Sequence, residues 1–584
     1  MRLSKVGFIL VVVCVFVRAD AVRCEEQQAA SADKGRPAND DSSPFGFSCD
    51  NQTTYTLASY CPQMAKAGLR WIRGFPTFNV IEPEQGRFDW SAVDGMIAAA
   101  TKNKMTISGL FFYNAPWINS KGDSLPVENL PAWSDYVSKV VEHSKGNVKY
   151  WEVWNETPNF IGKGTPSDYA RTVIAAHDAA KAADPTCQVG LSIQSQNVNW
   201  LEQTIQAGAK DHFDFIAVHP YEVLGVVESD GCEAEFMSIV PTIRKMLAKK
   251  NPARANVPIW FTEIGRDAGK DEKSQAIAIV KAYTLALAQG VSRINWFEGK
   301  DGDSGPMGLL RGDGTPRPAY TAIMNLTKYL GPNPRYIGWT LLQNAHYAFV
   351  FEGQAGPVMV TWTRPGTTRV VSFGARVRMV DPLSGVEIAA EDGSLSSAAS
   401  LIAGIPPALV MKALANKSRP FPWGGDYMGA KSVSVAMSSP NHEQGLHHLF
   451  CDATSRAVKI RGDLCRDCSL AGSQTFTVDP NFLSYTAETI TITAVLRRQS
   501  AKENAGFNLK YESSSGWKGA DGWHTIPEDV SWHTKTWTIT DPEFVGKWGF
   551  NFAFDSDGTQ FSKYQIKSVT VSKAAARERT AADH

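Results

Sequence analysis

Short apolar segments alternate with helical patterns between residues 44 and 330 of this 584-residue chain, and this alternation restricts the fold more than any other property of the sequence. Strands that alternate with helices predict an α/β domain with a parallel sheet. Eight segments are rich in β-branched or aromatic residues: 45–47, 69–73, 105–112, 148–154, 188–193, 213–218, 258–262 and 293–297. Eight strands, with no glycine-rich phosphate turn after the first, favour a (β/α)8 TIM barrel over an open doubly wound sheet.

Apolar residues at helical spacing occupy the segments between these strands. Ser91 is expected to cap a helix that carries Val93 and Ile97, and Asp168 to cap a second one. A third helix is expected to stop at Gly290, because glycine readily adopts the left-handed conformation that follows many helices. These segments complete the pattern of an α/β barrel.

Two β-sandwich domains are predicted beyond the barrel. Past Gly331 short alternating runs between Gly and Pro turns predict a small sandwich over 331–415, with strands at 348–351, 358–362, 369–373, 377–380 and 408–412. A second sandwich, loosely like carbohydrate-binding jelly rolls, is expected over 416–573, followed by a charged tail at 574–584. Its tryptophans are candidate stacking surfaces for sugars or, with equal weight, core residues: Trp517, Trp523, Trp532, Trp537 and Trp548.

The first residues have the features of an export signal. Arg2 and Lys5 precede an apolar run that is too short to span a bilayer, and Ala19-Asp20-Ala21 offers a cleavage site after residue 21. Residues 22–43 are polar and aperiodic, as in a disordered leader. We therefore expect a secreted or periplasmic protein with no membrane contact beyond the signal.

Charge and cysteine usage bear on the possible ligands. Lys and Arg number 59, as do Asp and Glu, so the chain lacks the basic excess that nucleic-acid binding requires.

Three cysteine pairs lie close enough in sequence to form disulfides, and the choice stays open: Cys49–Cys61, Cys451–Cys465 and Cys451–Cys468. The Cys465–Cys468 spacing resembles half of a zinc site, but only His447 and His448 lie near it, so we expect no metal.

Two glutamates stand at the carboxyl ends of predicted strands. Glu156 follows the fourth strand and Glu263 the seventh. The carboxyl ends of barrel strands meet on one face, so both side chains are expected to converge there. Two carboxyl groups can divide acid/base and nucleophilic work on an acetal, because different surroundings separate their pKa values. We interpret the two glutamates as a catalytic pair, with surface ion pairs as the alternative.

The segments Trp154-Asn155-Glu156 and Thr262-Glu263 resemble motifs of the clan A retaining glycoside hydrolases, most of all family 39, and are similar to those of families 5 and 51. The resemblance covers roughly residues 44–415. It implies that Glu156 is the acid/base and Glu263 the nucleophile. It extends to residues that lie near the catalytic pair in such enzymes: Arg73, His219, Tyr221 and Trp296. Relatives often carry His on the third strand, where this chain presents Tyr113 or Asn114, so the substrate preference stays open.

The chemistry of the side chains also indicates a role for each residue around the two glutamates. Asn155 can donate its amide to a sugar 2-hydroxyl, and the permanent charge of Arg73 would keep Glu263 ionised. Tyr221 could donate to the same carboxylate, and His219 could bond a hydroxyl or the acid unless it is a satisfied core histidine. Further candidates for substrate binding are Tyr113, with Trp117 and Trp296 as stacking platforms or plain packing residues. Glu152, about four residues deeper in its strand, is interpreted as structural.

The sequence therefore predicts an exported retaining glycoside hydrolase that acts on an oligosaccharide, polysaccharide or other glycoside. Glu263 would attack the anomeric carbon while Glu156 protonates the leaving oxygen, and Glu156 would then activate water. This chemistry needs no cofactor. The alternative is a carbohydrate-binding pseudoenzyme that holds a glycan without cleaving it. The sugar, exo or endo action and the oligomeric state stay open.

Overall fold

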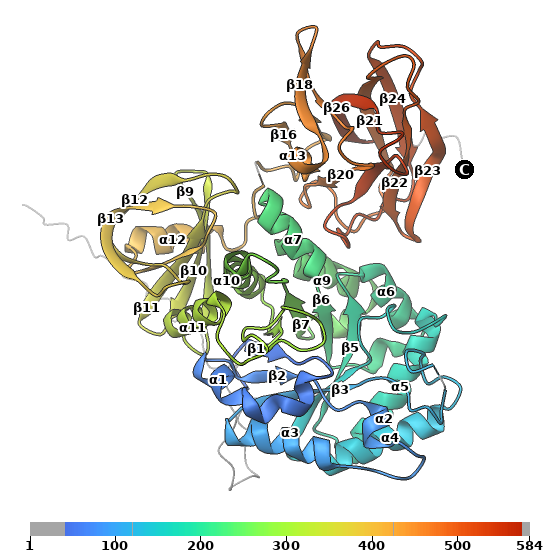
Figure 1. The fold of residues 1–584 in the computed structure, drawn as a ribbon, viewed down its shortest axis with the longest axis vertical. Coiled ribbons are helices and arrows are strands. Elements are labelled where there is room, and N and C mark those ends of the chain that lie inside the picture. The colour runs from blue at the N-terminus through green and yellow to red at the C-terminus, as the bar shows by residue number, and fades with distance from the viewer. Residues whose placement is uncertain (1–40, 120, 424, 575–584) are drawn as a thin grey trace, which may run out of the picture. The chain divides into compact units, whose positions relative to one another are not determined.

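The computed structural model describes residues 41–119, 121–423 and 425–574. Its first part is a closed barrel of eight parallel strands, each paired with its neighbours in chain order, with β8 returning to β1 (Figure 1). The strands are β1 (Phe45–Ser48), β2 (Trp71–Arg73), β3 (Thr106–Phe111), β4 (Val148–Val153), β5 (Gln188–Gln194), β6 (Phe215–His219), β7 (Ile259–Gly265) and β8 (Arg293–Phe297). The predicted TIM barrel is confirmed.

Helices follow the strands and surround the barrel (Figure 1). They are α1 (Cys61–Lys66), α2 (Phe78–Ile81), α3 (Ser91–Lys102), α4 (Leu130–Ser144), α5 (Pro166–Ala183), α6 (Val198–Gln206), α7 (Tyr221–Asp230), α8 (Glu233–Met237), α9 (Ile239–Lys250), α10 (Glu272–Ala288) and α11 (Pro318–Leu330). Short 3-10 turns are η1 (Thr53–Ser59), η2 (Ala209–Asp211) and η3 (Pro252–Arg254).

The predicted helix ends are partly corrected. Thr165, not Asp168, caps α5, and Asp168 is its partner in a reciprocal capping box, because its side chain accepts from the Thr165 backbone. Ser91 is the first residue of α3 rather than its cap. Gly290 has a φ of +85° just after α10 and ends that helix as expected.

Aromatic side chains fill the amino-terminal end of the barrel interior. Trp71 packs against Trp260 with ring centroids 5.4 Å apart, and Phe215 stacks on Trp260 at 4.0 Å. Gly190 on β5 admits this cluster, because a Cβ there would lie 2.2 Å from the Phe215 ring. These side chains close the amino-terminal end of the barrel, so a ligand can enter the barrel interior only from the carboxyl ends of the strands.

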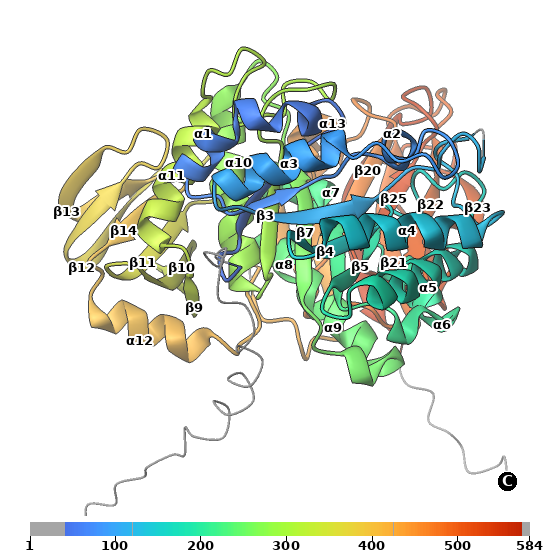
Figure 2. The same cartoon turned by 90° about the horizontal axis from the view of Figure 1, so that it is seen from below.

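The region predicted as the small sandwich is a six-stranded antiparallel sheet with a helix against it. Its strand order is β13-β12-β14-β11-β10-β9. The strands are β9 (Arg335–Leu342), β10 (His346–Gly353), β11 (Gly356–Trp362), β12 (Arg369–Val380), β13 (Glu387–Leu395) and β14 (Ser400–Ala403). Figure 2 shows the helix, α12 (Pro407–Asn416), beside this sheet.

The strand predicted at 408–412 is wrong, because those residues form α12. The segment has the favourable helix start of Pro407 as first residue, and apart from Val410 the next five residues are good helix formers, namely Ala, Leu, Met and Lys. It packs so closely on β9 that a Cβ at Gly338 would lie 2.0 Å from the Ala413 carbonyl oxygen. An apolar run alone did not distinguish helix from strand.

The last region is a sandwich of two antiparallel sheets, as predicted. One contains β15, β16, β18, β19, β21, β24 and β26, and the other has the order β17-β20-β25-β22-β23. The strands of the first are β15 (Ser432–Ala436), β16 (His442–Gln444), β18 (Arg456–Ile460), β19 (Asp463–Asp467), β21 (Ile490–Arg498), β24 (His533–Ile539) and β26 (Tyr564–Lys573). Those of the second are β17 (Leu446–Leu449), β20 (Ser473–Val478), β22 (Gly506–Ser513), β23 (Gly516–Thr525) and β25 (Phe552–Asp555), and the short helix α13 (Cys451–Thr454) follows β17.

The expectations for the chain termini, the cysteines and membrane spans can be compared with the structure as follows. The export signal, nearly all of the polar leader and the charged tail lie outside the described residues. Across residues 41–119, 121–423 and 425–574 the seven cysteines are free, so none of the candidate disulfides is formed there. Within the same ranges no helix is long and apolar enough to cross a membrane.

Candidate active site

A pocket of about 190 Å³, which we call the carboxylate pocket, opens at the carboxyl ends of the barrel strands and contains both predicted catalytic residues. Its polar lining includes Asp50, Asn51, Arg73, Asn155, Glu156, Glu263 and Asp303, and its aromatic lining Phe75, Phe112, Tyr113, Phe160 and Phe297. After β4 the chain turns sharply, because Trp154 and Glu156 both adopt left-handed backbone conformations with φ of +66° and +47°. Non-glycine residues in this conformation are strained and concentrate at functional sites.

Glu263 on β7 is held by two donors. Arg73 Nη1 donates to its Oε2 at 2.6 Å, and the Tyr221 hydroxyl donates to its Oε1 at 2.7 Å. Each carboxylate oxygen therefore has a strong partner, one of them a permanent cation. The two contacts fix the side chain in one orientation.

Arg73 also joins Glu263 to a buried charge network. Its Nε and Nη2 atoms each lie 3.2 Å from one oxygen of Glu152, which has no exposed surface. Burial raises the pKa of Glu152, but Arg73 and His219, through their charges and hydrogen bonds, together outweigh it and lower the pKa to about 2. Glu152 is thus the structural anchor of Arg73. Arg73 Nη2 further donates to Asn155 Oδ1 at 2.6 Å, which orients the Asn155 amide nitrogen away from the guanidinium.

Glu156 pairs with a histidine instead. His219 Nδ1 lies 2.9 Å from Glu156 Oε1, and its Nε2 lies 3.0 Å from Thr262 Oγ1. Burial raises the pKa of Glu156, whereas the hydrogen bond and charge of His219 lower it, and the net direction is downward. Burial lowers the pKa of His219, but Glu263, Glu152 and Glu156 raise it to about 9. The Glu156–His219 pair therefore holds one proton over the neutral range.

The two glutamates face each other closely. One carboxylate oxygen of each, together with a ring nitrogen of His219, lies in a group whose members are all within 4.8 Å of one another. Retaining glycosidases separate their carboxyl groups by about 5 to 5.5 Å, whereas inverting enzymes need about 6.5 to 9.5 Å for a water. The spacing fits direct attack by one of the glutamates.

The other predicted site residues divide into two groups. Tyr113, with a φ of +60°, lines the pocket. Trp117 lies outside it, where its Nε1 donates to the Glu82 carbonyl at 3.0 Å and its ring packs edge-on against Phe78. Trp296 is 0 % exposed in the barrel core and cannot serve as a stacking platform. Its neighbour Phe297 lines the pocket instead, because adjacent residues of a strand point to opposite sides.

Sequence reasoning missed two acidic residues of the pocket. Asp50 follows β1 and Asp303 follows β8, and the Asp303 backbone donates to Asp50 Oδ2 at 2.7 Å. Their carboxyl groups interact, so the pKa of Asp303 is raised and that of Asp50 lowered. Both follow strands that neighbour each other only after the barrel closes, and their position at strand ends was the signal available.

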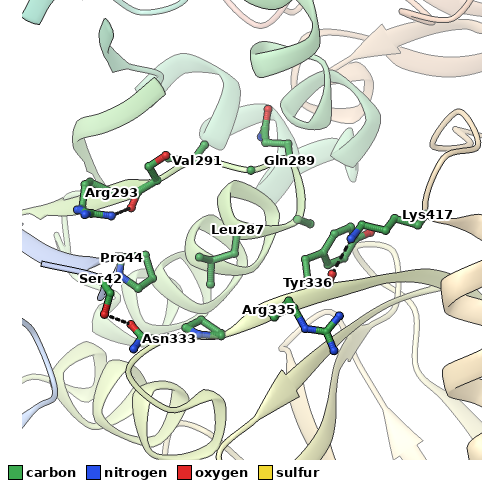
Figure 3. Close-up of a pocket in the computed structure, with 14 residues that line it drawn as sticks. Ser42, Pro44, Leu287, Gln289, Val291, Arg293, Asn333, Arg335, Tyr336 and Lys417 are labelled. Carbon is green, nitrogen blue, oxygen red and sulfur yellow. Dashed lines mark hydrogen bonds between the residues drawn. The ribbon is translucent and has the colours of Figure 1, made fainter. Parts of the chain in front are cut away.

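Two sets of potential metal ligands occur among the described residues. One is Glu156, His219 and Glu263, and the other is His177, Asp178 and His212 outside the pocket. In the first set the hydrogen bonds and the adjacent Arg73 already account for the arrangement. A larger hollow of about 650 Å³ lies at the opposite end of the barrel (Figure 3), where Pro44 precedes β1 and Arg293 begins β8. None of the predicted site residues lines it.

Two family models match the barrel. The model for glycosyl hydrolase family 10 matches residues 77–207, and the model for the glycosyl hydrolase catalytic core matches residues 165–322. The first range includes Asn155 and Glu156, and the second includes His219, Tyr221 and Glu263. The matched segments thus contain both glutamates of the pocket.

Individual proteins show the same similarity. Endo-1,4-beta-xylanase B of Thermotoga neapolitana is 26% identical over 277 residues, which are 43% of this chain and 77% of the xylanase. A beta-xylosidase of Caldicellulosiruptor saccharolyticus is 25% identical over 244 residues, which are 36% of this chain and 49% of the xylosidase. A family 39 glycoside hydrolase of Bacteroides cellulosilyticus WH2 shares the fold, with a TM-score of 0.54 and 18% identity over 63% of this chain and 82% of that one.

Proposed function

The barrel of this chain belongs to the clan A superfamily of glycoside hydrolases, and on that premise we propose that the protein is a retaining glycosidase. The observation that carries the proposal is the pair of carboxylates, with oxygens within 4.8 Å of each other and with different partners. Glu263, held by Arg73 and Tyr221, is the nucleophile. Glu156, paired with His219, is the acid/base.

In the first step Glu263 attacks the anomeric carbon while the departing oxygen takes a proton from Glu156. The proton of the Glu156–His219 pair can pass from Nδ1 to Oε1 along the 2.9 Å hydrogen bond, so Glu156 is supplied with a proton at neutral pH. Asn155 presents its amide to the sugar 2-hydroxyl, where a hydrogen bond strengthens in the transition state. The products are the alcohol and a covalent glycosyl-enzyme.

In the second step Glu156, now a carboxylate, takes a proton from water, and the water oxygen attacks the anomeric carbon. The bond to Glu263 breaks, and Glu263 returns to the carboxylate that Arg73 stabilises. Two inversions give net retention. Phe297 and Tyr113 flank the pocket and can contact the apolar faces of the sugar, while Asp50 and Asp303 can accept from its hydroxyls.

The proposed substrate is a β-linked glycoside of xylose or a related pyranose. The names of the similar xylanase and xylosidase support this choice. The sequence features of residues 1–21 support action outside the cytoplasm. No described feature favours the binding-only alternative, since both carboxylates are present and positioned.

A panel of 4-nitrophenyl β-glycosides tests the proposal, with xyloside, glucoside, mannoside and arabinoside compared by kcat/KM. The anomer released first is then identified by NMR. A β-anomer from a β-glycoside supports double displacement. Release of the α-anomer contradicts retention, and no turnover of any member contradicts the glycosidase function.

A further inference from the structure

A second pocket of about 230 Å³ lies where the carboxyl-terminal sandwich meets the barrel, and we call it the seam pocket. Three tryptophans line it: Trp200 of α6, Trp517 of β23 and Trp548 in the segment between β24 and β25. Its polar lining consists of amides, hydroxyls, one cation and one carboxyl group: Asn197, Asn199, Gln203, Ser513, Ser515, Lys547 and Glu512. Neither domain could form this pocket without the other.

The segment that carries Trp548 is hydrogen-bonded to both the sandwich and the barrel. The buried Glu512 accepts from the backbone nitrogens of Val545, Gly546 and Lys547 at 3.0, 2.9 and 2.7 Å. From the barrel, Gln196 Nε2 donates to the Gly546 carbonyl at 2.6 Å and Ser195 Oγ to the Lys547 carbonyl at 2.5 Å. The walls of the seam pocket are therefore held in place before any ligand arrives.

Polar groups of the pocket have unused hydrogen-bonding capacity. Asn199 Nδ2 donates to the Ser513 carbonyl at 3.1 Å, but its Oδ1 is buried with no hydrogen-bond partner. A buried carbonyl without a donor is unfavourable by about 1 to 3 kcal/mol. The indole of Trp517 is 38 % exposed, although its edge rests on Phe550. An exposed aromatic face beside an unsatisfied acceptor suits a ligand with both apolar faces and hydroxyl donors.

The seam pocket also adjoins the proposed acid/base. Trp200 Nε1 donates at 3.0 Å to the hydroxyl of Thr157, the residue that follows Glu156. In a retaining glycosidase the acid/base faces the leaving group, so groups beyond it contact the leaving-group side of the glycan. Glu156 and the seam pocket are thus linked by one residue and one hydrogen bond.

We propose that the seam pocket binds a sugar ring of the glycan on the leaving-group side, at a distance from the bond that is cleaved. This inference rests on the proposed function for the identity of the ligand as a glycan. The ring lies against Trp517 and Trp548, and its hydroxyls bond to Asn199, Gln203 and the serines. The pocket is smaller than the ~300 to 1,000 Å³ typical of sites for drug-sized ligands, so it takes one ring of a chain.

Binding is measured by titration calorimetry in the Glu263→Ala background, which prevents turnover, with xylohexaose, cellohexaose and mannohexaose as probes. We expect at least one hexasaccharide to bind, and Trp517→Ala to weaken it by about tenfold, the effect of ~1.4 kcal/mol of lost contact. Gln203→Ala, at an exposed position of α6, should weaken it by a smaller factor without affecting the fold. If no hexasaccharide binds, the proposal is wrong.

Trp523→Ala is the matched control. Trp523 lies on the same strand as Trp517, is also 38 % exposed and rests edge-on against Phe561 at 5.4 Å, as Trp517 rests on Phe550 at 5.3 Å. It does not line the seam pocket. It should leave hexasaccharide affinity unchanged, and thermal unfolding shows whether both variants are folded. Equal losses in the two variants, or none in Trp517→Ala, would overturn the proposal.

Activity in the otherwise wild-type enzyme separates this inference from the proposed function. Trp517→Ala should lower kcat/KM for the bound hexasaccharide about tenfold and leave 4-nitrophenyl monoglycosides unaffected, because these do not reach the seam pocket. If hexasaccharides bind through Trp517 but no glycoside is hydrolysed, the glycosidase proposal fails and the seam pocket stands. If glycosides are hydrolysed but Trp517 has no effect, the reverse holds.

Discussion

His219 Nδ1 lies 2.9 Å from Glu156 Oε1, which makes a buried imidazole the nearest hydrogen-bond partner of the proposed acid/base. Glu263, only a few ångströms away, has Arg73 and Tyr221 as partners instead. The two glutamates therefore differ in what surrounds them, and this difference assigns one to proton transfer and the other to attack.

The shared proton predicts how activity depends on pH. The Glu156–His219 pair should keep its proton until pH approaches about 9, the raised pKa of His219, so kcat/KM should fall only as pH rises through that value. In His219→Gln the proton can reside only on Glu156, and the alkaline limb should move to lower pH. An unchanged limb in this variant, measured with an aryl glycoside, would show that the histidine does not share the proton.

Arg73 should support stability as well as activity. Arg73→Met leaves the fully buried Glu152 without the cation that binds both of its oxygens, and we expect a loss of about 3 to 5 kcal/mol in the free energy of unfolding. Adding Glu152→Gln should recover much of the stability but not the activity, because Glu263 still lacks its donor. Arg87→Met, which breaks an exposed pair with Glu84, is the control and should change stability by less than about 1 kcal/mol in denaturant titrations.

Azide distinguishes the roles of the two glutamates. In Glu156→Ala, substrates with activated leaving groups should still form the glycosyl-enzyme, and azide should attack it to give a β-glycosyl azide from a β-glycoside. In Glu263→Ala, azide should attack from the opposite face and give the α-azide. The reversed pattern would exchange the two roles. Each variant alone should lower turnover at least about 10²-fold.

Buried acids where the sandwich meets the barrel should make stability fall at alkaline pH. Burial, followed by the charge of Glu512, raises the pKa of Glu235 to about 8, and burial raises that of Glu512 to about 7. In the unfolded chain these carboxyl groups lose their protons near the ordinary pKa of 4.5, whereas the folded protein keeps them to higher pH. The free energy of unfolding therefore falls as pH rises from about 4.5 through about 8.

Glu235→Gln should flatten this fall, because the amide stays neutral and can keep the contact with Thr477. Thermal unfolding between pH 5 and 9 measures the effect. Glu391→Gln, at an exposed position of β13, is the control and should retain the wild-type profile. A profile for Glu235→Gln that matches the wild type would contradict the assignment.

Deleting residues 416–584 should spare the chemistry but weaken the barrel. The residues that line the carboxylate pocket all fall between Cys49 and Ser304, so 4-nitrophenyl glycosides should still be hydrolysed. The deletion removes the partners of Ser195 and Gln196, so the melting temperature should fall. A folded truncated protein that hydrolyses no aryl glycoside would show that the sandwich completes the active site.

The sequence by itself determined the barrel and its catalytic face. Strand propensity and spacing are local properties, so the eight strands and the positions of Glu156 and Glu263 near the carboxyl ends of β4 and β7 could be predicted directly. The partners of Glu263, namely Arg73 and Tyr221, followed from the same strand ends and from the resemblance to known motifs.

Only the tertiary structure decided which neighbouring side chains face a site. Trp296 and Phe297 differ by one strand position, and the barrel buries one and exposes the other to the pocket. Asp50 and Asp303 are 253 residues apart and meet only because β8 closes on β1. Trp200 and Trp517 come from different domains and line the same seam pocket. The loop that lines the pocket with them is fixed by backbone hydrogen bonds to Glu512. Such contacts depend on chain closure and domain packing, which local patterns do not encode.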